Sequence, residues 1–445
     1  MRARLPWLLA LAYAVLFTLL GMLKYAVHRN LVDFGIFAQT ASSAFGCFCN
    51  PIEGSHWAFH FSPVLYLAGF ALLIWRSPFA LIALQSIGCA LVIPPVYALV
   101  ARRAERSIAA MSAIATALYP PMAGLAFVDF HENAFAPAAI AWGAWAFDGG
   151  YATAAIVSAI VAICVKEDQA IFVAVCGLAG ALRFRGTRRG WTALVAGVLG
   201  IAAAAAFFVV IQPHHVASPQ WAPQRFYAWT RADAAALFPG GLLQRIGFLA
   251  LILVPLGLLP LGTRTFWFAV PALAEVLLSR MSTTFTLGTH YTGAWLGYVL
   301  AAFAFAVRDL PQPRARRLLW ICIGLCVLEF AAADPLHPGL NLRAVQPRDR
   351  VLDRMLDSLP RDALIATQEE AYTHLALRDP NARLLPESAD APIDACFVLI
   401  DRDYPDSPRL KEYGGAFMRL VNAGAYVPVR TDGGAQLYRR RGACR

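Results

Sequence analysis

Three consecutive charged residues, Lys166-Glu167-Asp168, interrupt a long apolar stretch of this 445-residue chain. The flanking segments 156–165 and 170–178 carry no charge, and charges beside such sequence are costly unless they face water or one another. Lys166 is also one of only three lysines in the chain. A tight turn between two helices at a membrane surface would explain the triplet structurally. The functional interpretation is that the triplet binds a phosphate or a carboxylate inside a polar cavity.

A second cluster, Asp129-Phe130-His131-Glu132, brings three potential metal or proton ligands to the expected start of a helix. The cluster also fits a helix cap, with Asp129 as the capping residue and Glu132 three residues later. As a metal site it is incomplete, because oxygen-rich sites for divalent cations take ligands from further segments. Asp129, His131 and Glu132 are therefore candidate ligands for an ion such as Mg²⁺ or Mn²⁺, with helix capping as the alternative.

Three further motifs place isolated polar side chains beside apolar segments. Asp33 follows the first apolar run, where it could serve as a helix cap or as a first-turn acid favoured by the helix dipole. His60 precedes a short apolar segment, and His290-Tyr291 precedes a long one. Each ring alone is typical of an interfacial residue, but together they favour a shared site.

The elements that must position these residues are membrane helices. The chain is 59% hydrophobic and only 15% charged, with a positive mean hydropathy of +0.55. A soluble protein of this size lacks the interior volume to bury so much apolar surface. Long runs such as 5–23 and 242–261 suit a hydrocarbon core about 30 Å thick. Because no clean cleavage site follows the run 5–23, we interpret it as an uncleaved first span rather than a signal peptide.

The distribution of arginines predicts the topology. The segment from residue 334 onward is neutral, so the net charge of +10 belongs to the first 333 residues, where arginines cluster between apolar runs. Placing these clusters in the cytoplasm puts the N-terminus inside. It also makes the positive charge a topology signal rather than a nucleic-acid footprint, and no nucleic-acid partner is expected. About eleven spans are consistent with this orientation: 5–23, 78–101, 107–127, 135–148, 151–165, 168–182, 190–211, 241–261, 263–280, 289–307 and 317–333.

This topology gathers the uncommon ionisable residues on the outer face of a bacterial inner membrane. The segment 61–75 is short and flanked by prolines, so we treat it as a re-entrant or interfacial helix. We expect an all-α polytopic domain over 1–333 with an outward-facing polar cavity, in contact with membrane lipids. The residues assigned to this outer face include Asp33, Glu53, His56, His60, Asp129, His131, Glu132, Lys166, Glu167, Asp168 and His290.

The segment 334–445 has a different pattern and predicts a small extracytoplasmic α/β domain. Strand-like runs at 363–367, 382–385, 395–400 and 425–430 alternate with helix candidates at 369–377 and 407–423. No glycine-rich phosphate loop follows a strand, so a nucleotide-binding role is not supported.

Four cysteines fall outside the membrane in this topology, where disulfides are permitted. A Cys396–Cys444 bridge is plausible, whereas Cys47 and Cys49 are too closely spaced for an ordinary structural bridge. The loop 212–240, with His214-His215 and several aromatic residues, is a candidate lid over the cavity.

The combined motifs resemble a family of bacterial and archaeal multispanning membrane proteins, domain of unknown function 2079. That family is similar to the GT-C superfamily of membrane glycosyltransferases. The matching segments are 33–39, 60–63, Gln85, 95–97, 129–132, 166–168, 290–291, 363–368 and 374–378.

The GT-C resemblance implies a transferase that uses a polyprenyl-phosphate sugar as donor. Its first outer loop carries a catalytic acid, which by position would be Asp33, although this motif has one acid where many GT-C enzymes have two. The donor phosphate would need cationic partners. Candidate substrate-binding residues are His60, Lys166, Glu167, Asp168, His290 and Tyr291. A transporter or lipid-handling protein without catalysis is the main alternative, and a scaffold that recruits a partner through the segment 334–445 is another.

Overall fold

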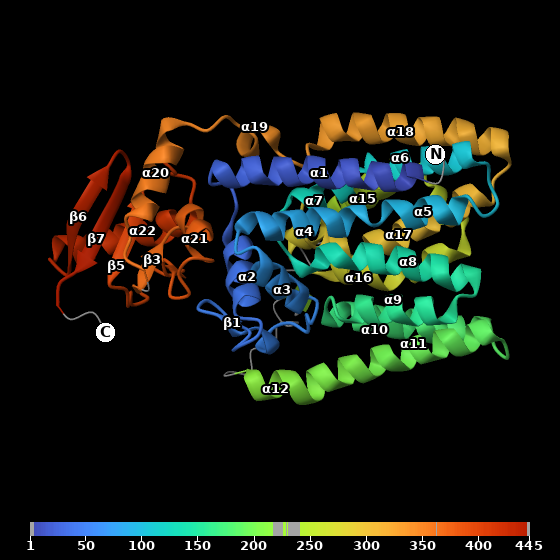
Figure 1. Cartoon of the computed structure of the whole chain (residues 1–445), viewed down its shortest axis with the longest axis horizontal. Helices are drawn as coiled ribbons and strands as arrows, with labels where there is room; N and C mark the ends of the chain where they lie inside the picture. The colour runs from blue at the N-terminus through green and yellow to red at the C-terminus, as the bar shows by residue number, and fades with distance from the viewer. Residues whose placement is uncertain (1–3, 217–225, 228, 230–240, 362, 443–445) are drawn as a thin grey trace.

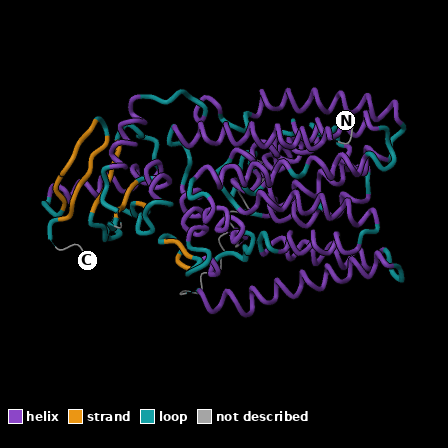
Figure 2. The backbone as a smooth tube through the Cα atoms, viewed as in Figure 1, coloured by secondary structure: helices purple, strands orange, loops and turns teal. Residues whose placement is uncertain are grey.

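The computed structural model describes residues 4–216, 226, 227, 229, 241–361 and 363–442, and shows a long helical part followed by a smaller part that contains a sheet (Figure 1). Figure 2 shows the strands of this sheet gathered at one end of the molecule, beyond the ends of the helices of the first part. The described helices of the first part are α1 (Leu5–Ala26), α2 (Val32–Ser42), α3 (Leu65–Ile74), α4 (Pro78–Ala90), α5 (Ile93–Val100), α6 (Arg106–Ala117), α7 (Pro120–Phe127), α8 (Ala136–Gly149), α9 (Ala152–Ile163), α10 (Glu167–Arg183), α11 (Arg188–Ala205), α12 (Gln212–His215), α15 (Leu242–Leu253), α16 (Val270–Leu278), α17 (Thr292–Arg308) and α18 (Gln312–Ala333).

The helices follow the hydrophobic pattern from which they were predicted. Helix α17 is apolar on all sides and lies at the centre of the bundle, where Trp295 and Phe303 are fully buried. Helix α1 instead exposes a row of leucines, among them Leu8 and Leu11, as expected for a helix that faces lipid. The membrane-like helical fold predicted from composition is confirmed.

By length and composition alone, three described helical segments could cross a membrane: Leu5–Ala26, Pro78–Val100 and Arg188–His215. Helices α6 and α7 make a fourth when counted together, but they are bent by 49° at Pro120 and Pro121. Proline lacks the backbone N–H that would continue the first helix, which accounts for the bend. Helices also occupy the positions of the other predicted spans, and most of them are shorter than these segments, although α18 has 22 residues. The count of eleven spans stays a prediction.

The segment predicted to be re-entrant or interfacial forms the ten-residue helix α3. At 1.5 Å per residue it rises about 15 Å, roughly half of a bilayer core about 30 Å thick. The preceding loop is attached to the turn before α10, because Val64 N donates a hydrogen bond to Cys164 O at 2.8 Å. This attachment places His60 beside the Lys166 triplet.

The second part contains a five-stranded mixed sheet, in the segment where the alternating pattern predicted strands and helices. The strand order is β4 (Arg383–Leu384), β3 (Ile365–Thr367), β5 (Phe397–Asp401), β7 (Ala435–Arg440) and β6 (Tyr426–Asp432). Strand β3 runs parallel to β4 and β5, whereas β7 is antiparallel to β5 and β6. The accompanying helices are α19 (Pro338–Asn341), α20 (Pro347–Asp357), α21 (Glu369–Leu375) and α22 (Pro408–Asn422). Strand β7 was absent from the sequence prediction.

The sheet-containing part rests on α2, the helix that carries Asp33. Tyr372 Oη donates to Gln39 Oε1 at 2.6 Å, and Gln39 Nε2 donates to the carbonyl oxygens of Asp379 and Ala382 at 3.3 and 3.1 Å. All three Gln39 bonds are buried, so α2 is fixed from the side of the second part. Gly35 provides the space for the Tyr372 ring.

Substituting Gly35 with alanine is expected to loosen this contact. A Cβ at position 35 would lie 2.2 Å from Tyr372 Cε1, so helix and ring must separate. Overpacking of this kind costs about 1–3 kcal/mol of unfolding free energy. Thermal unfolding of the purified chain in detergent measures the effect. Gly46→Ala, whose Cβ would meet only Ser43 O at 3.6 Å, is the control, and equal stability of both variants would contradict the expectation.

The cysteines differ from the prediction. Cys47 and Cys49 form a disulfide, with Cα atoms 5.2 Å apart, at the start of the hairpin of β1 (Cys49–Asn50) and β2 (Gly54–Ser55). The prediction that they are too close was wrong because Phe48 between them adopts a left-handed conformation, with φ of 48°. Cys444 and most of the loop 212–240 lie outside the described residues, so the Cys396–Cys444 bridge and the lid stay predictions.

Candidate active site

The candidate active site draws side chains from segments that are far apart in the sequence. They lie at the start of α2, in the loop before α3, in the turn between α7 and α8, at the start of α10 and before α17. Figure 1 shows α2 at the end of the helical part that faces the sheet. Contacts between these segments join nearly all of the predicted site residues into two adjoining groups.

The first group is a line of side chains that begins at Asp33. Its Oδ2 lies 3.5 Å from His290 Nδ1. The His290 ring stacks on the His131 ring with centroids 3.8 Å apart and planes 7° apart. His131 Nδ1 in turn lies 2.9 Å from Glu132 Oε2. Glu132 is fully buried, whereas the Asp33 side chain is 40% exposed, so the line opens to the outside at Asp33. The Tyr291 ring lies 4.2 Å from that of His290 and belongs to the same group.

The environment of Asp33 makes its carboxyl group a weak acid. Burial, followed by the negative charges of Asp129, Glu53 and Glu132, raises its pKa to about 7, and the positive charge of Lys166 opposes this rise. Asp33 therefore changes its charge near neutral pH. It lies in the first turn of α2, with Leu31 at the cap position, which agrees with the first-turn alternative and not with a capping role.

Glu53 contributes to this environment although it was not among the predicted site residues. Asn50 holds it in place, because Asn50 Nδ2 donates to Glu53 Oε2 at 3.1 Å and Asn50 Oδ1 accepts from Glu53 N at 2.9 Å. Burial raises the pKa of Glu53 as well. The available signal was its place in the acidic outer loop with Asp33; nothing in the spacing showed that the hairpin folds back toward α2.

The second group surrounds Lys166. Glu167 Oε1 lies 2.9 Å from His60 Nδ1, and its Oε2 accepts a hydrogen bond from Phe61 N at 2.9 Å. Lys166 Nζ lies 3.9 Å from Asp168 Oδ2, which is beyond hydrogen-bonding distance. Glu167 thus attaches the loop before α3 to the start of α10. The separation of Lys166 and Asp168 means that the N–H donors of Lys166 are not used in a hydrogen bond to Asp168.

The charges near Lys166 keep it protonated. Burial alone would lower its pKa, but Asp168, Glu167 and Glu132 outweigh that effect and hold the pKa above its usual range. The Lys166 side chain is only 9% exposed. Burial also opposes protonation of His60, yet the charge of Glu167 raises the pKa of the imidazole above its ordinary value. The second group therefore offers positive charge to an anion.

Asp129 is committed to other residues. Its Oδ1 accepts from Lys24 Nζ at 2.8 Å and from Asn30 Nδ2 at 3.1 Å, and its Oδ2 accepts from Leu31 N at 2.6 Å. These bonds fix the connection between α1 and α2, and hence the position of Asp33. The helical turn after it, η3 (Glu132–Phe135), has His131 rather than Asp129 at its cap. The capping alternative for Asp129 was therefore wrong.

The three candidate metal ligands do not converge. In the described part of the chain, the ligand atoms of Asp129, His131 and Glu132 do not all lie within 4.8 Å of one another. Both carboxylate oxygens of Glu132 nevertheless lack a hydrogen-bond partner among the described residues. A divalent cation at these three residues stays a prediction.

Known structures share this fold. The chain is similar to ArnT from Cupriavidus metallidurans bound to undecaprenyl phosphate, with 14% identity, a TM-score of 0.54 and coverage of 96% of this chain and 98% of that one. The apo form of the same protein matches at 13% identity with a TM-score of 0.55 and the same coverage. An oligosaccharyltransferase from Archaeoglobus fulgidus in complex with Zn and sulfate matches at 13% identity and a TM-score of 0.41, over 88% of this chain and 68% of that one. The expected likeness to GT-C glycosyltransferases is confirmed at the level of the fold.

Sequence comparison identifies the family. No curated protein matches the chain. The family described as "Predicted membrane protein (DUF2079)" matches residues 28–434, which include both groups of the candidate site and four of the five strands of the sheet. The chain therefore belongs to the DUF2079 family of predicted membrane proteins.

Proposed function

We propose that the chain transfers a sugar from a polyprenyl-phosphate donor to an acceptor hydroxyl at the outer face of the bacterial inner membrane. The observation that carries this proposal is the position of Asp33. Its carboxylate is partly exposed, lies 3.5 Å from a histidine and adjoins a group of positive charge. The likeness of the fold to ArnT bound to undecaprenyl phosphate supports the choice of donor.

Asp33 would act as general base. The acceptor oxygen attacks the anomeric carbon, the bond between that carbon and the phosphate oxygen breaks, and the acceptor proton passes to the Asp33 carboxylate. A base is most effective when its pKa lies near the working pH, and the pKa of about 7 meets this condition. His290, which stacks on His131, lies 3.5 Å from the carboxylate and would orient it.

Lys166 and His60 would bind the phosphate of the donor and of the departing polyprenyl phosphate. Negative charge grows on the leaving oxygen as its bond to the sugar breaks, so fixed positive charges stabilise the transition state. Asp168 and Glu167 keep these cations in place, and Tyr291 adds an aromatic surface beside His290.

The proposed orientation has about eleven spans, a cytoplasmic N-terminus and an extracytoplasmic domain over 334–445. The inner ends of the helices would carry the arginine clusters. There Arg102 and Arg308 both pair with Asp148, and Arg308 also pairs with Asp309 at 3.1 Å. These pairs lie at the helix ends opposite to the Lys166 turn, which agrees with the positive-inside rule.

Binding of undecaprenyl phosphate to the purified chain tests the proposal. Lys166→Gln is expected to weaken binding about 10–100-fold, the equivalent of one charge-assisted hydrogen bond of about 1.5–3 kcal/mol. Lys411→Gln is the matched control, because Lys411 is an exposed lysine of the second part.

The second arm of the test follows sugar transfer in membranes that contain the protein. Wild type is expected to move labelled sugar from the lipid donor to an acceptor. Two outcomes would overturn the proposed enzymatic function and favour a transporter. They are equal lipid binding by the two lysine variants, or solute uptake without any sugar transfer.

A further inference from the structure

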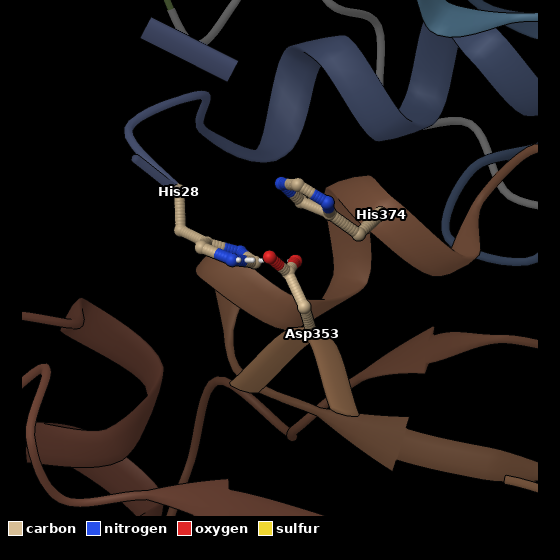
Figure 3. Close-up of side chains that lie close together, drawn as sticks. All are labelled: His28, Asp353 and His374. Carbon is tan, nitrogen blue, oxygen red and sulfur yellow. Dashed lines mark ion pairs between the residues drawn. The ribbon is translucent and has the colours of Figure 1, made fainter. Parts of the chain in front are cut away.

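A group of two histidines and an aspartate lies where the sheet-containing part meets the end of α1. His28 follows α1, Asp353 belongs to α20 and His374 belongs to α21. Figure 3 shows the three side chains turned toward a common space, with the His28 ring beside the Asp353 carboxylate and the His374 ring above both. One ligand atom from each lies within 4.8 Å of the other two, the only such group of three in the described part of the chain.

In each of the two histidine rings, one nitrogen lies beside a backbone carbonyl oxygen. His28 Nδ1 lies 3.4 Å from Glu370 O, and His374 Nε2 lies 3.1 Å from Tyr25 O. A ring nitrogen beside a carbonyl oxygen carries the proton, so the opposite nitrogen keeps its lone pair. Metal-binding histidines are typically oriented by an outer hydrogen bond of this type.

His28 Nε2 is the atom that points most clearly to a ligand at this position. The side chain is completely buried, and the atom has no hydrogen-bond partner among the described residues, although Asp353 Oδ1 lies 3.1 Å away. A buried nitrogen with a lone pair facing a carboxylate oxygen is unfavourable unless a proton or a cation lies between them. The Asp353 side chain is 49% exposed, which gives an ion a route from solvent.

We propose that His28, Asp353 and His374 bind one divalent transition-metal ion that fastens the sheet-containing part to α1. Two imidazoles and one carboxylate fit Zn²⁺ best, with water as the fourth ligand. Bonds of about 2.0–2.2 Å in a tetrahedral site place ligand atoms roughly 3.3–3.5 Å apart. The separation of 3.1 Å between His28 Nε2 and Asp353 Oδ1 is close to this value.

Metal binding requires a small rearrangement of the rings. The centroids of His28 and His374 are 4.0 Å apart, with planes 27° apart. An ion lies in the plane of each ring that binds it, so the two rings must turn away from their stacked arrangement. The Tyr25 ring stacks on the other face of His374 at 4.0 Å and would follow this movement. Bound metal would then affect the end of α1 and, through it, the start of α2.

Metal content of the purified full-length chain, prepared without a histidine tag, tests this site. We expect one zinc per chain by elemental analysis, and a higher unfolding temperature when zinc is added to chelator-treated protein. Asp353→Asn and His374→Gln are expected to weaken zinc binding more than about 100-fold, beyond the 10–100-fold typical of outer-shell changes. Asp353→His, which supplies a nitrogen ligand in place of the carboxylate oxygen, should bind zinc. Asp357→Asn, one turn further along α20 and exposed, is the matched control.

Further variants distinguish this site from the candidate active site. Asp33→Asn and Glu132→Gln should keep their zinc, because neither residue belongs to the proposed group. Zinc lost from Glu132→Gln but retained by Asp353→Asn would overturn the assignment in favour of the other cluster. A wild-type chain that neither contains zinc nor gains thermal stability from it would overturn the proposal outright. Since Asp353 is half exposed, its replacement tests the site even if changes at His28 impair folding.

Discussion

Replacing Asp33 with asparagine is expected to lower the rate of sugar transfer by roughly 10²–10⁴-fold, the usual contribution of a general base. Asparagine has the shape of aspartate but cannot accept the acceptor proton. Donor binding should change little, because Lys166 and His60 lie in the other group of side chains. Initial transfer rates at saturating donor measure the effect. Asp406→Asn, an exposed carboxylate of the second part, is the control and should behave as wild type.

The pH dependence of the wild-type rate belongs to the same expectation. The base acts as a carboxylate, so the rate should rise with pH and level off above about pH 7, the pKa of Asp33. Glu53→Gln removes a negative charge that raises this pKa, and the midpoint should move to lower pH. Lys166→Gln removes a positive charge that lowers it, and the midpoint should move to higher pH. Midpoints that do not move, or that move in the same direction in both variants, would show that another group limits the rate.

Sequence alone predicted most of the side chains that the structure brings together at the candidate site, but it missed Glu53, and Asp129 is bound elsewhere. The reason is physical: charges such as Lys166 and Glu132 are too costly to leave among apolar helices unless they face one another or water. The sequence did not predict which of these side chains pair with one another. The bond between Glu167 and His60 depends on how α3 folds back, and the partners of Asp129 come from α1 and from the turn after it. Such pairings join residues about 100 positions apart, and no local pattern encodes them.

The strands of the sheet, too, could be predicted only where a local sequence pattern indicates them. Strands such as β5 are short apolar runs and were predicted from their composition, while β7 has a glutamine and two arginines among its six residues and was missed. The group of His28, Asp353 and His374 was missed for a different reason. His28 is more than 300 positions away from Asp353 and His374 in the sequence, and the three come together only because α21 rests on the end of α1.

Replacing Asp129 with alanine is expected to destabilise the fold by about 3–5 kcal/mol, the usual cost of removing one partner from a buried ion pair. Lys24 and Asp129 have side chains only 8% and 6% exposed, and the ammonium would remain buried without its counter-charge. Unfolding by heat in detergent measures the loss. Asp394→Asn is the control, because its pair with Arg440 is exposed and should contribute no more than about 1 kcal/mol.

The double variant Lys24→Met/Asp129→Leu separates stability from positioning. Removing both charges together should recover most of the lost stability, since apolar residues replace buried ion pairs at little cost. It does not restore the bond from Leu31 N to Asp129 Oδ2, which sets the start of α2. Sugar transfer should therefore stay impaired although the protein is stable. The rise of the transfer rate with pH should move to lower pH, because the charge on Asp129 no longer raises the pKa of Asp33. Full recovery of transfer in the double variant would mean that Asp129 acts on stability alone and has no part in positioning Asp33.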